Sequence, residues 1–160
     1  MEILKYPHPN LFIQCNEVTV FGPELLVLLE SMWETMHKHK GLGLASNQVG
    51  LNYRMFTMLG PENEKLFIIN PKIILQSKMQ ANVKEGCLSA PGEFLMLNER
   101  TMWVQIMYQD ETGGVRSGKF QGLHAVCVQH EMDHLDGKSH LQSKSLSRQV
   151  RRGLAKKWGV

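Results

Sequence analysis

The feature that most constrains this chain is a short run of histidines near its end, HEMDHLDGKSH, from His130 to His140. The first two histidines are four residues apart, Glu131 follows the first, and the third histidine lies six residues beyond the second. The run matches two metal-binding signatures, the short H-E-x-x-H and the longer H-E-x-x-H-x-x-G-x-x-H. Residues four apart share one face of an α-helix, so the run predicts a helix that carries two metal ligands.

The residues before this run continue the same helical face. Apolar residues and both histidines recur at helical spacing across residues 123–136, and Gly137 ends the pattern. The two histidines would therefore point inward, where a bare pair would lose its solvation without compensation, and we predict a metal site. Glu131 is adjacent to His130 and projects to the side, where its carboxylate can act as a general base on a metal-bound water.

A hydrolytic metal keeps one coordination position open, so a third protein ligand is needed. The candidates are Cys15, Cys87, Cys127 and His140. Cys127 is too far along the helix, because the seven residues to His134 rise roughly 10 Å, whereas two ligand atoms on one ion lie about 3 to 4 Å apart. We expect Cys127 to be a small apolar residue of the core or of a pocket.

His140 would be the third ligand of a metzincin protease. Those proteases have a turn with a methionine beneath the metal, farther along the chain. The residues after His140 contain no methionine and leave little sequence for the C-terminal part of such a protease. We therefore expect His140 to lie outside the metal site, at an exposed position. Spacing alone does not rank Cys87 above Cys15.

The rest of the chain predicts helices and antiparallel strands. Residues 23–40 have the apolar spacing of a helix with proline in its first turn. Residues 53–59 and 66–75 predict strands, the second interrupted at Asn70-Pro71, and residues 102–109 and 115–120 predict a hairpin across DETGG. Near the end, a helical apolar stripe is formed by Leu146, Val150, Leu154 and Trp158. We expect an α+β fold, with antiparallel strands packed around a central metal-binding helix and with further N-terminal and C-terminal helices.

Length, charge and cysteine content narrow the class of protein. A chain of 160 residues fits one domain, and we expect residues 1–160 to form a single catalytic domain. The net charge of +3 is too small to imply specific nucleic-acid binding. Three widely spaced cysteines argue against disulfides, and no segment reads as a signal peptide or membrane span, so we expect a cytoplasmic protein without membrane contact.

The end of the chain is basic. Six Lys and Arg residues and no acid follow His140. They predict either a solvated face on a docked terminal helix or a contact with a phosphate-rich surface such as a ribosome.

Three stretches, in this order, resemble the sequence motifs of peptide deformylases: GLGLASNQVG, EGCLSAPG and QHEMDHLDG. The first motif is usually written G-x-G-x-A-A-x-Q, and here Ser46 replaces the second alanine. The second motif, at residues 85–89, and the third, at residues 130–134, are intact. The resemblance spans nearly the whole chain. It implies hydrolytic removal of the N-formyl group from N-formylmethionyl peptides, that is, from the initiator methionine of newly synthesised polypeptides.

The resemblance also implies roles for individual residues. The metal ligands would be Cys87, His130 and His134. Glu131 would take a proton from the metal-bound water, whose hydroxide attacks the formyl carbonyl, and would return it to the leaving amine. The formyl oxygen would be stabilised by the side-chain amide of Gln48 and the backbone N–H of Leu88, because pre-aimed donors need no reorganisation. The family generally uses Fe²⁺, and Zn²⁺, Ni²⁺ or Co²⁺ can occupy its site.

The methionine side chain would enter an apolar pocket, with glycine where the backbone must approach the substrate. The residues expected to bind substrate are Leu42, Gly43, Val83, Gly86, Leu123, Val126 and Cys127. Deformylases often carry an arginine shortly after the second motif that helps to hold the peptide, but here Phe94 lies near that place and Arg100 follows later. His124 stands where the family usually has an apolar residue, and we expect it to be exposed or to cap the helix.

Two other functions remain compatible with the motifs alone. One is a metal amidase or peptidase of the H-E-x-x-H type with broader specificity, which would not distinguish formyl from acetyl peptides. The other is a non-catalytic binding protein that keeps a structural zinc. Glu131 and Gln48 argue against the second, because a purely structural site needs neither side chain.

Overall fold

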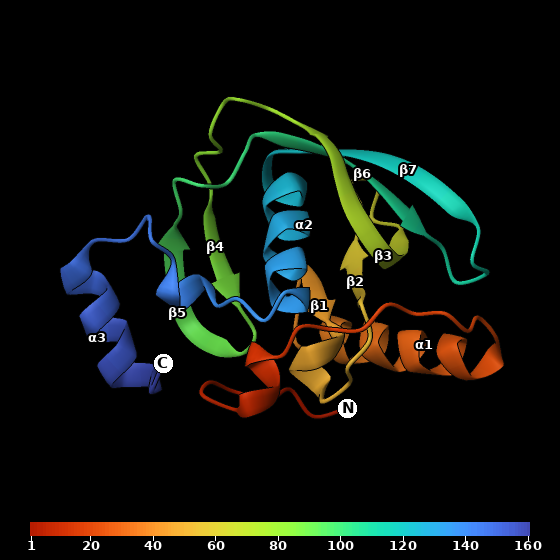
Figure 1. The fold of residues 1–160 in the computed structure, drawn as a ribbon, viewed down its shortest axis with the longest axis horizontal. Helices are drawn as coiled ribbons and strands as arrows, with labels where there is room; N and C mark the ends of the chain where they lie inside the picture. Colours follow the sequence, from red (N-terminus) through yellow and green to blue (C-terminus); the bar gives the residue numbers. More distant parts are fainter.

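A computed structural model describes residues 1–160, which form three α-helices and two antiparallel sheets (Figure 1). The helices are α1 (Pro23–Lys38), α2 (Gly122–Leu135) and α3 (Arg148–Trp158). The larger sheet has the order β1-β2-β3-β6-β7, with β1 (Gly43–Ala45), β2 (Met55–Leu59), β3 (Lys65–Gln76), β6 (Trp103–Gln109) and β7 (Val115–Gln121). The smaller sheet pairs β4 (Lys84–Cys87) with β5 (Ala90–Met96). Short 3-10 helices occur at Pro9–Phe12, Ser46–Val49 and His140–Gln142. The predicted α+β fold is confirmed.

Helix α2 lies at the centre of the molecule, with the larger sheet on one side and β4–β5 on the other (Figure 1). Ala125 and Val128 of this helix are fully buried and share a core cluster with Phe56 of β2 and Ile106 of β6. Packing against the sheet therefore fixes how α2 is rotated. This rotation leaves His130 and His134 facing the smaller sheet and the loops beside it.

Helix α1 covers the other end of the larger sheet. Leu29 and Met32 are fully buried in a second cluster with Met55 and Ile69 of the sheet. The helix ends at Lys38, two residues before the predicted end, and the chain then turns through Lys40 in a left-handed conformation with φ of 54°. This turn brings the first motif into β1.

The predicted hairpin at residues 102–120 is formed by β6 and β7, paired from Trp103–Gln121 to Gln109–Val115. The predicted interruption at Asn70 is not a break, because β3 is continuous from Lys65 to Gln76. Asn70 has a positive φ of 50°, and the pairing with β6 shifts register between Ile69 and Lys72. A bulge thus takes the place of the predicted gap.

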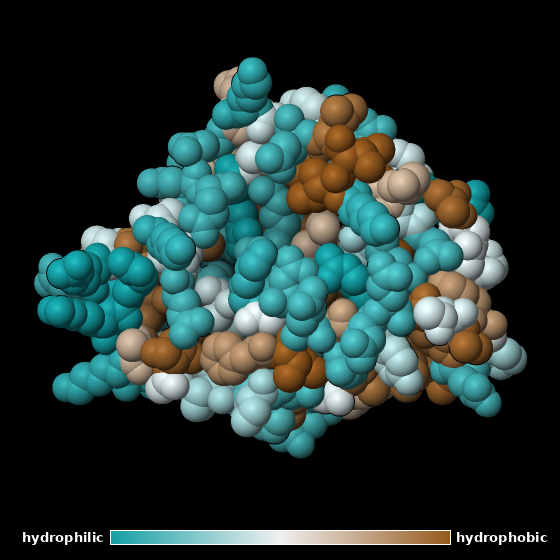
Figure 2. All heavy atoms as spheres, viewed as in Figure 1, coloured by the Kyte–Doolittle hydropathy of each residue, from teal (hydrophilic) through white to brown (hydrophobic).

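Helix α3 packs against the N-terminal segment and the 3-10 helix at His140–Gln142, called η3. Leu154 is buried in a third cluster with Tyr6, Leu11 and Leu141. Val150 is 43% exposed, so the predicted apolar stripe is only partly covered. The surface of α3 is strongly hydrophilic, whereas apolar side chains gather over β3, where the exposed residues include Ile73, Ile74 and Leu75 (Figure 2). None of the helices is long and apolar enough to cross a membrane.

Candidate active site

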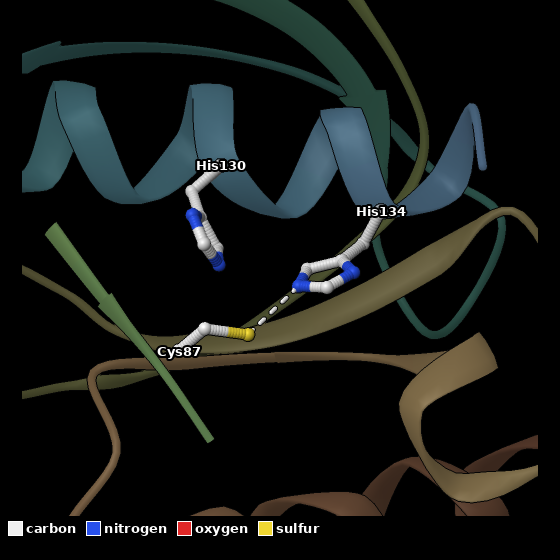
Figure 3. A group of neighbouring side chains, drawn as sticks. All are labelled: Cys87, His130 and His134. Atoms are coloured by element: carbon white, nitrogen blue, oxygen red, sulfur yellow. Dashed lines mark hydrogen bonds between the residues drawn. The ribbon is translucent and has the colours of Figure 1, made fainter. Parts of the chain in front are cut away.

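The predicted ligands of the third motif project from α2 toward the end of β4. His130 and His134 lie one turn apart, and their ring centroids are 4.8 Å from each other. Cys87, the last residue of β4, reaches the same place from the opposite side, with its Sγ atom 3.2 Å from Nε2 of His134 (Figure 3). One potential ligand atom from each of the three side chains lies within 4.8 Å of the others, and all three residues are buried. Cys15 and Cys127 do not join this cluster.

This donor set fits a transition-metal ion. One thiolate and two imidazole nitrogens leave a coordination position open, as hydrolytic centres require. Burial lowers the pKa of His134 well below its ordinary range, which keeps the ring neutral and its lone pair free. For His130, burial acts in the same direction, but hydrogen bonds with Cys87 and Glu85 outweigh it and raise the pKa well above the ordinary range.

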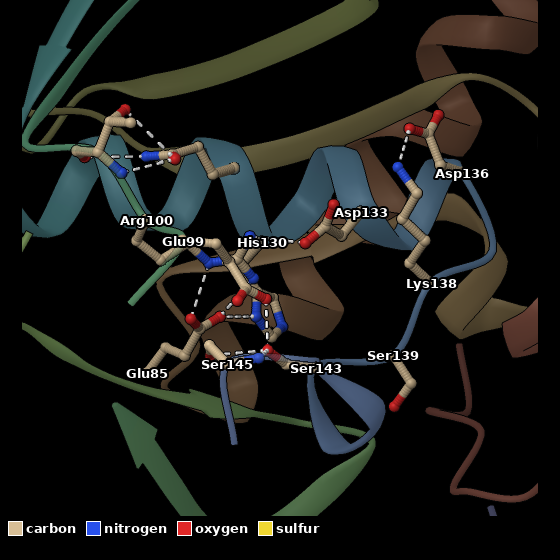
Figure 4. A network of polar contacts seen from close by, with 12 residues as sticks. Glu85, Glu99, Arg100, His130, Asp133, Asp136, Lys138, Ser139, Ser143 and Ser145 are labelled. Carbon is tan, nitrogen blue, oxygen red and sulfur yellow. Dashed lines mark hydrogen bonds and ion pairs between the residues drawn. The ribbon is translucent and has the colours of Figure 1, made fainter. Parts of the chain in front are cut away.

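A buried chain of charged groups orients His130. Its Nδ1 atom is 2.5 Å from Oε2 of Glu85, so its Nε2 atom is the one that faces Cys87 and His134 (Figure 3). Both Glu85 oxygens accept hydrogen bonds from Arg100, at 2.8 and 2.9 Å, and Arg100 also donates to Asp133 at 2.6 Å (Figure 4). Burial alone would raise the pKa of Glu85, but the bonds from His130 and Arg100 lower it to about 2. Glu85 is thus an anion that supports the imidazole.

Glu131 lies on α2 beside the three ligands and is 4% exposed. Its Oε2 atom has no hydrogen-bond partner in the protein. Burial raises the pKa of Glu131 to about 7, because the charged form loses hydration. A carboxylate with this pKa can both accept and return a proton near neutral pH.

Gly43 is the close neighbour of Glu131. A Cβ atom at this position would lie 2.5 Å from Oε1 of Glu131 and 2.7 Å from Sγ of Cys127. Any larger residue would therefore displace the carboxylate, which explains the glycine at this point of the first motif.

Gln48 and Leu88 lie on the other side of the cluster. The Gln48 side chain is fixed by the Ala45 N–H, which donates to its Oε1 at 2.9 Å. Its Nε2 atom donates to Oγ of Ser89 at 3.1 Å and lies 3.6 Å from Sγ of Cys87. Leu88 follows Cys87, and its backbone N–H has no acceptor within the protein. Two N–H donors thus flank Cys87 where an oxygen atom could be bound.

A cavity of about 410 Å³ opens above this cluster. Six of the seven predicted substrate-binding residues line it: Leu42, Gly43, Gly86, Leu123, Val126 and Cys127. Val83, which is half-buried directly before β4, is not among the lining residues. Leu123 was expected on the inward face of α2, but it is 50% exposed at the rim.

Two further expectations, those for His140 and His124, differ from the structure. His140 is not exposed: it is 3% exposed, and its ring packs against that of His130 with centroids 5.1 Å apart. Arg100, the later arginine, does not line the cavity, because it is buried between Glu85 and Asp133. His124 is half-buried, and no side chain caps the N-terminus of α2.

The sequence motifs did not identify the rim of the cavity. Phe94 is 67% exposed there and lies against Gly86, across the β4–β5 pair. The other lining residues outside the predicted set are His39, Lys40, Gly41, Lys84, Glu85, Pro91, Gly92 and Glu93. His39 and Lys40 directly precede the first motif and Gly41 begins it, so their proximity could have been inferred from the turn that follows α1.

Comparison with known proteins identifies the family of this chain. The family model described as polypeptide deformylase matches residues 1–149. A peptide deformylase of Alkalilimnicola ehrlichii is 39% identical over 161 residues, which cover 98% of this chain and 89% of the relative. A peptide deformylase-like protein of Agrobacterium fabrum is 38% identical over 98% of this chain and 93% of its own length. The crystal structure of peptide deformylase from Ehrlichia chaffeensis superposes with a TM-score of 0.91 at 35% identity, covering 99% of this chain and 94% of that one. The chain therefore belongs to the peptide deformylase family.

Proposed function

We propose that this deformylase hydrolyses its substrate at the buried cluster beneath the cavity, with one metal ion held by Cys87, His130 and His134. The chain is a metal-dependent hydrolase of the peptide deformylase family, which removes the N-formyl group from newly synthesised polypeptides. The observation that carries the proposal for the site is the convergence of a thiol and two imidazoles within 4.8 Å, beside the unpartnered carboxylate of Glu131.

We propose Fe²⁺ as the resident ion, with Zn²⁺, Ni²⁺ or Co²⁺ able to substitute. A mixed sulfur and nitrogen donor set suits all four ions, so the choice of iron rests on the family resemblance. When bound, such an ion supplies Lewis acidity, which polarises a carbonyl group and makes water more acidic.

The proposed role of Glu131 is to move the proton. Its free Oε2 atom would accept a proton from the water that adds to the formyl carbon. The same atom would then donate the proton to the amine nitrogen as the C–N bond breaks, which releases formate and the free N-terminus. A pKa of about 7 suits both halves of this cycle.

The proposed role of Gln48 and Leu88 is to stabilise the negative charge that develops on the formyl oxygen. The Nε2 atom of Gln48 and the N–H of Leu88 are both fixed before the substrate arrives. Donors of this kind stabilise a tetrahedral state without reorganisation.

The cavity accounts for the methionine. We propose that its thioether side chain is received by Leu42, Leu123, Val126 and Cys127, with Gly43 and Gly86 letting the backbone of the substrate come close. Val83 does not line the cavity and receives no part of the side chain in this proposal. Phe94 stands at the rim in place of a charged side chain, so we expect apolar contact there and no ionic anchoring of the peptide by this position.

The decisive assay compares formyl-Met-Ala-Ser with acetyl-Met-Ala-Ser, with metal content measured in the same anaerobic sample. The deformylase assignment predicts cleavage of the formyl peptide alone, because only hydrogen flanks the formyl carbonyl and a tight site excludes the acetyl methyl group. Cleavage of both peptides at similar rates would instead indicate a metal amidase of broad specificity.

We also propose that residues 1–160 act as one catalytic domain in the cytoplasm, where formylated chains leave the ribosome.

We further propose that the basic face of α3 contacts ribosomes. Lys157 pairs with Glu93, whereas Arg151, Arg152 and Lys156 take part in none of the ion pairs of the protein. Changing these three to Glu should abolish salt-sensitive co-sedimentation with ribosomes and leave cleavage of short peptides intact. Unchanged co-sedimentation would leave only a solvated face.

A further inference from the structure

Three consecutive residues of the N-terminal segment bind the two loops that carry Gln48 and Leu88. The N–H of Leu4 donates to the carbonyl of Gln48 at 2.8 Å, and the N–H of Tyr6 donates to the carbonyl of Ser89 at 3.1 Å. Between them, Nζ of Lys5 donates to the carbonyl of Leu88 at 2.5 Å. The segment, red in Figure 1, therefore ties together parts of the chain that lie more than forty residues apart.

The contact of Lys5 falls on a peptide unit with a second partner. This unit joins Leu88 to Ser89, and its N–H points at Sγ of Cys87, at 3.4 Å. A peptide unit is planar, so a contact that fixes its carbonyl also fixes the direction of its N–H. The preceding N–H, that of Leu88, is the proposed donor to the formyl oxygen and is one residue away. Lys5 thus fixes the Ser89 N–H directly, and it restrains the Leu88 N–H through the backbone of Leu88.

The contact is also electrostatically suited to this task. An ammonium group forms a stronger hydrogen bond than a neutral donor and polarises the amide that accepts it. Lys5 takes part in none of the ion pairs of the protein, so no carboxylate competes for its charge. The polarised amide makes the Ser89 N–H a better donor to the Cys87 sulfur.

We propose that Lys5 is a positioning residue of the deformylase reaction. By fixing the Leu88–Ser89 peptide it keeps the Ser89 N–H facing the Cys87 sulfur, and by restraining the conformation of Leu88 it keeps the Leu88 N–H of the preceding peptide facing the formyl oxygen. The proposal rests on the function proposed for Leu88. If Lys5 only anchored the N-terminal segment, replacing it would lower the stability of the protein and leave the rate of the chemical step unchanged.

The test replaces the amine and keeps the aliphatic stem. Lys5→Met should lower kcat for formyl-Met-Ala-Ser by about 5- to 30-fold with KM within about 2-fold, which is less than the roughly 10²- to 10³-fold loss typical when an oxyanion donor itself is removed. Lys5→Arg should keep most of kcat, because it retains a charged donor. Lys78→Met is the matched control, since Lys78 is exposed and makes no polar contact through its amine.

A spectroscopic measurement separates positioning from a general loss of stability. In the zinc-loaded protein, Lys5→Met should shift the amide nitrogen signals of Leu88 and Ser89, whereas Lys78→Met should shift neither, and the metal-to-protein ratio should stay unchanged in both. The proposal is overturned by an unchanged kcat in Lys5→Met, by a lowered kcat with unshifted amide signals, or by loss of metal. If Gln48→Leu also leaves kcat unchanged, the assignment of the oxyanion donors fails; if only Lys5→Met is silent, only the positioning role fails.

Discussion

Arg100 offers a direct test of the buried chain of charges behind the metal ligands. Arg100 is 4% exposed, makes two hydrogen bonds to Glu85 and makes a third to Asp133. Arg100→Met would leave the Glu85 carboxylate buried with His130 as its only charged partner. Breaking a buried ion pair in this way costs about 3 to 5 kcal/mol of unfolding free energy. In a chain of this size that corresponds to a Tm lower by about 6 to 20 °C.

Thermal unfolding followed by circular dichroism measures this loss. The matched control is Arg116→Met, because Arg116 is exposed and pairs with Asp110 at the surface. An exposed pair contributes only about 0 to 1 kcal/mol, so the control should unfold close to the wild-type temperature. Combining Arg100→Met with Glu85→Gln should recover at least about 1 kcal/mol, because the uncompensated charge is removed. Equal Tm shifts for the two arginine variants would refute the reasoning.

Three further predictions follow from the site and the hairpin. Glu131→Ala should lower kcat by about 10²- to 10⁴-fold with the metal still bound, and an active variant would remove Glu131 from the mechanism. Gln48→Leu should lower kcat more than it raises KM, because the proposed contact strengthens in the transition state, whereas a raised KM at equal kcat would limit Gln48 to substrate binding. Hydrogen bonds from Thr112 and Arg116 lower the pKa of Asp110 to about 2 from 3.8, so its contribution to stability should be present above about pH 4 and lost as the pH falls through about 2. An NMR titration of the Asp110 carboxyl group that gave an ordinary pKa would contradict this.

The central helix was predictable because one pattern carried several signals. Helical spacing, the ending glycine and two histidines four apart all pointed to α2, and the structure places both histidines on one inward face. The hairpin of β6 and β7 was equally accessible, since alternation and a turn sequence agree there. Cys87 was different, because spacing along a chain cannot order ligands from separate elements, and only the resemblance to known motifs distinguished Cys87 from Cys15.

Interactions between distant segments explain most of the errors. The sequence predicted an exposed His140 after the helix. In the structure the 3-10 helix at His140–Gln142 folds back, and the ring of His140 packs against the ring of His130. Arg100 and Glu85 are fifteen residues apart and belong to no common pattern, so their pairing required the structure. Lys5 gave no signal at all, since a lone exposed lysine in a sequence carries no information about the carbonyl it binds.

The identity of the third ligand is the central claim, and metal content tests it most directly. Purified Cys87→Ala and His140→Phe are compared with the wild type by metal-to-protein ratio and formyl-peptide turnover. His140→Phe keeps a ring of similar size in the same space and removes both nitrogens, which have no partner in the protein. We expect Cys87→Ala to lose both metal and activity, because only two ligands, His130 and His134, would remain for the ion. We expect His140→Phe to keep both metal and activity. Retention of metal in Cys87→Ala together with its loss in His140→Phe would contradict the account.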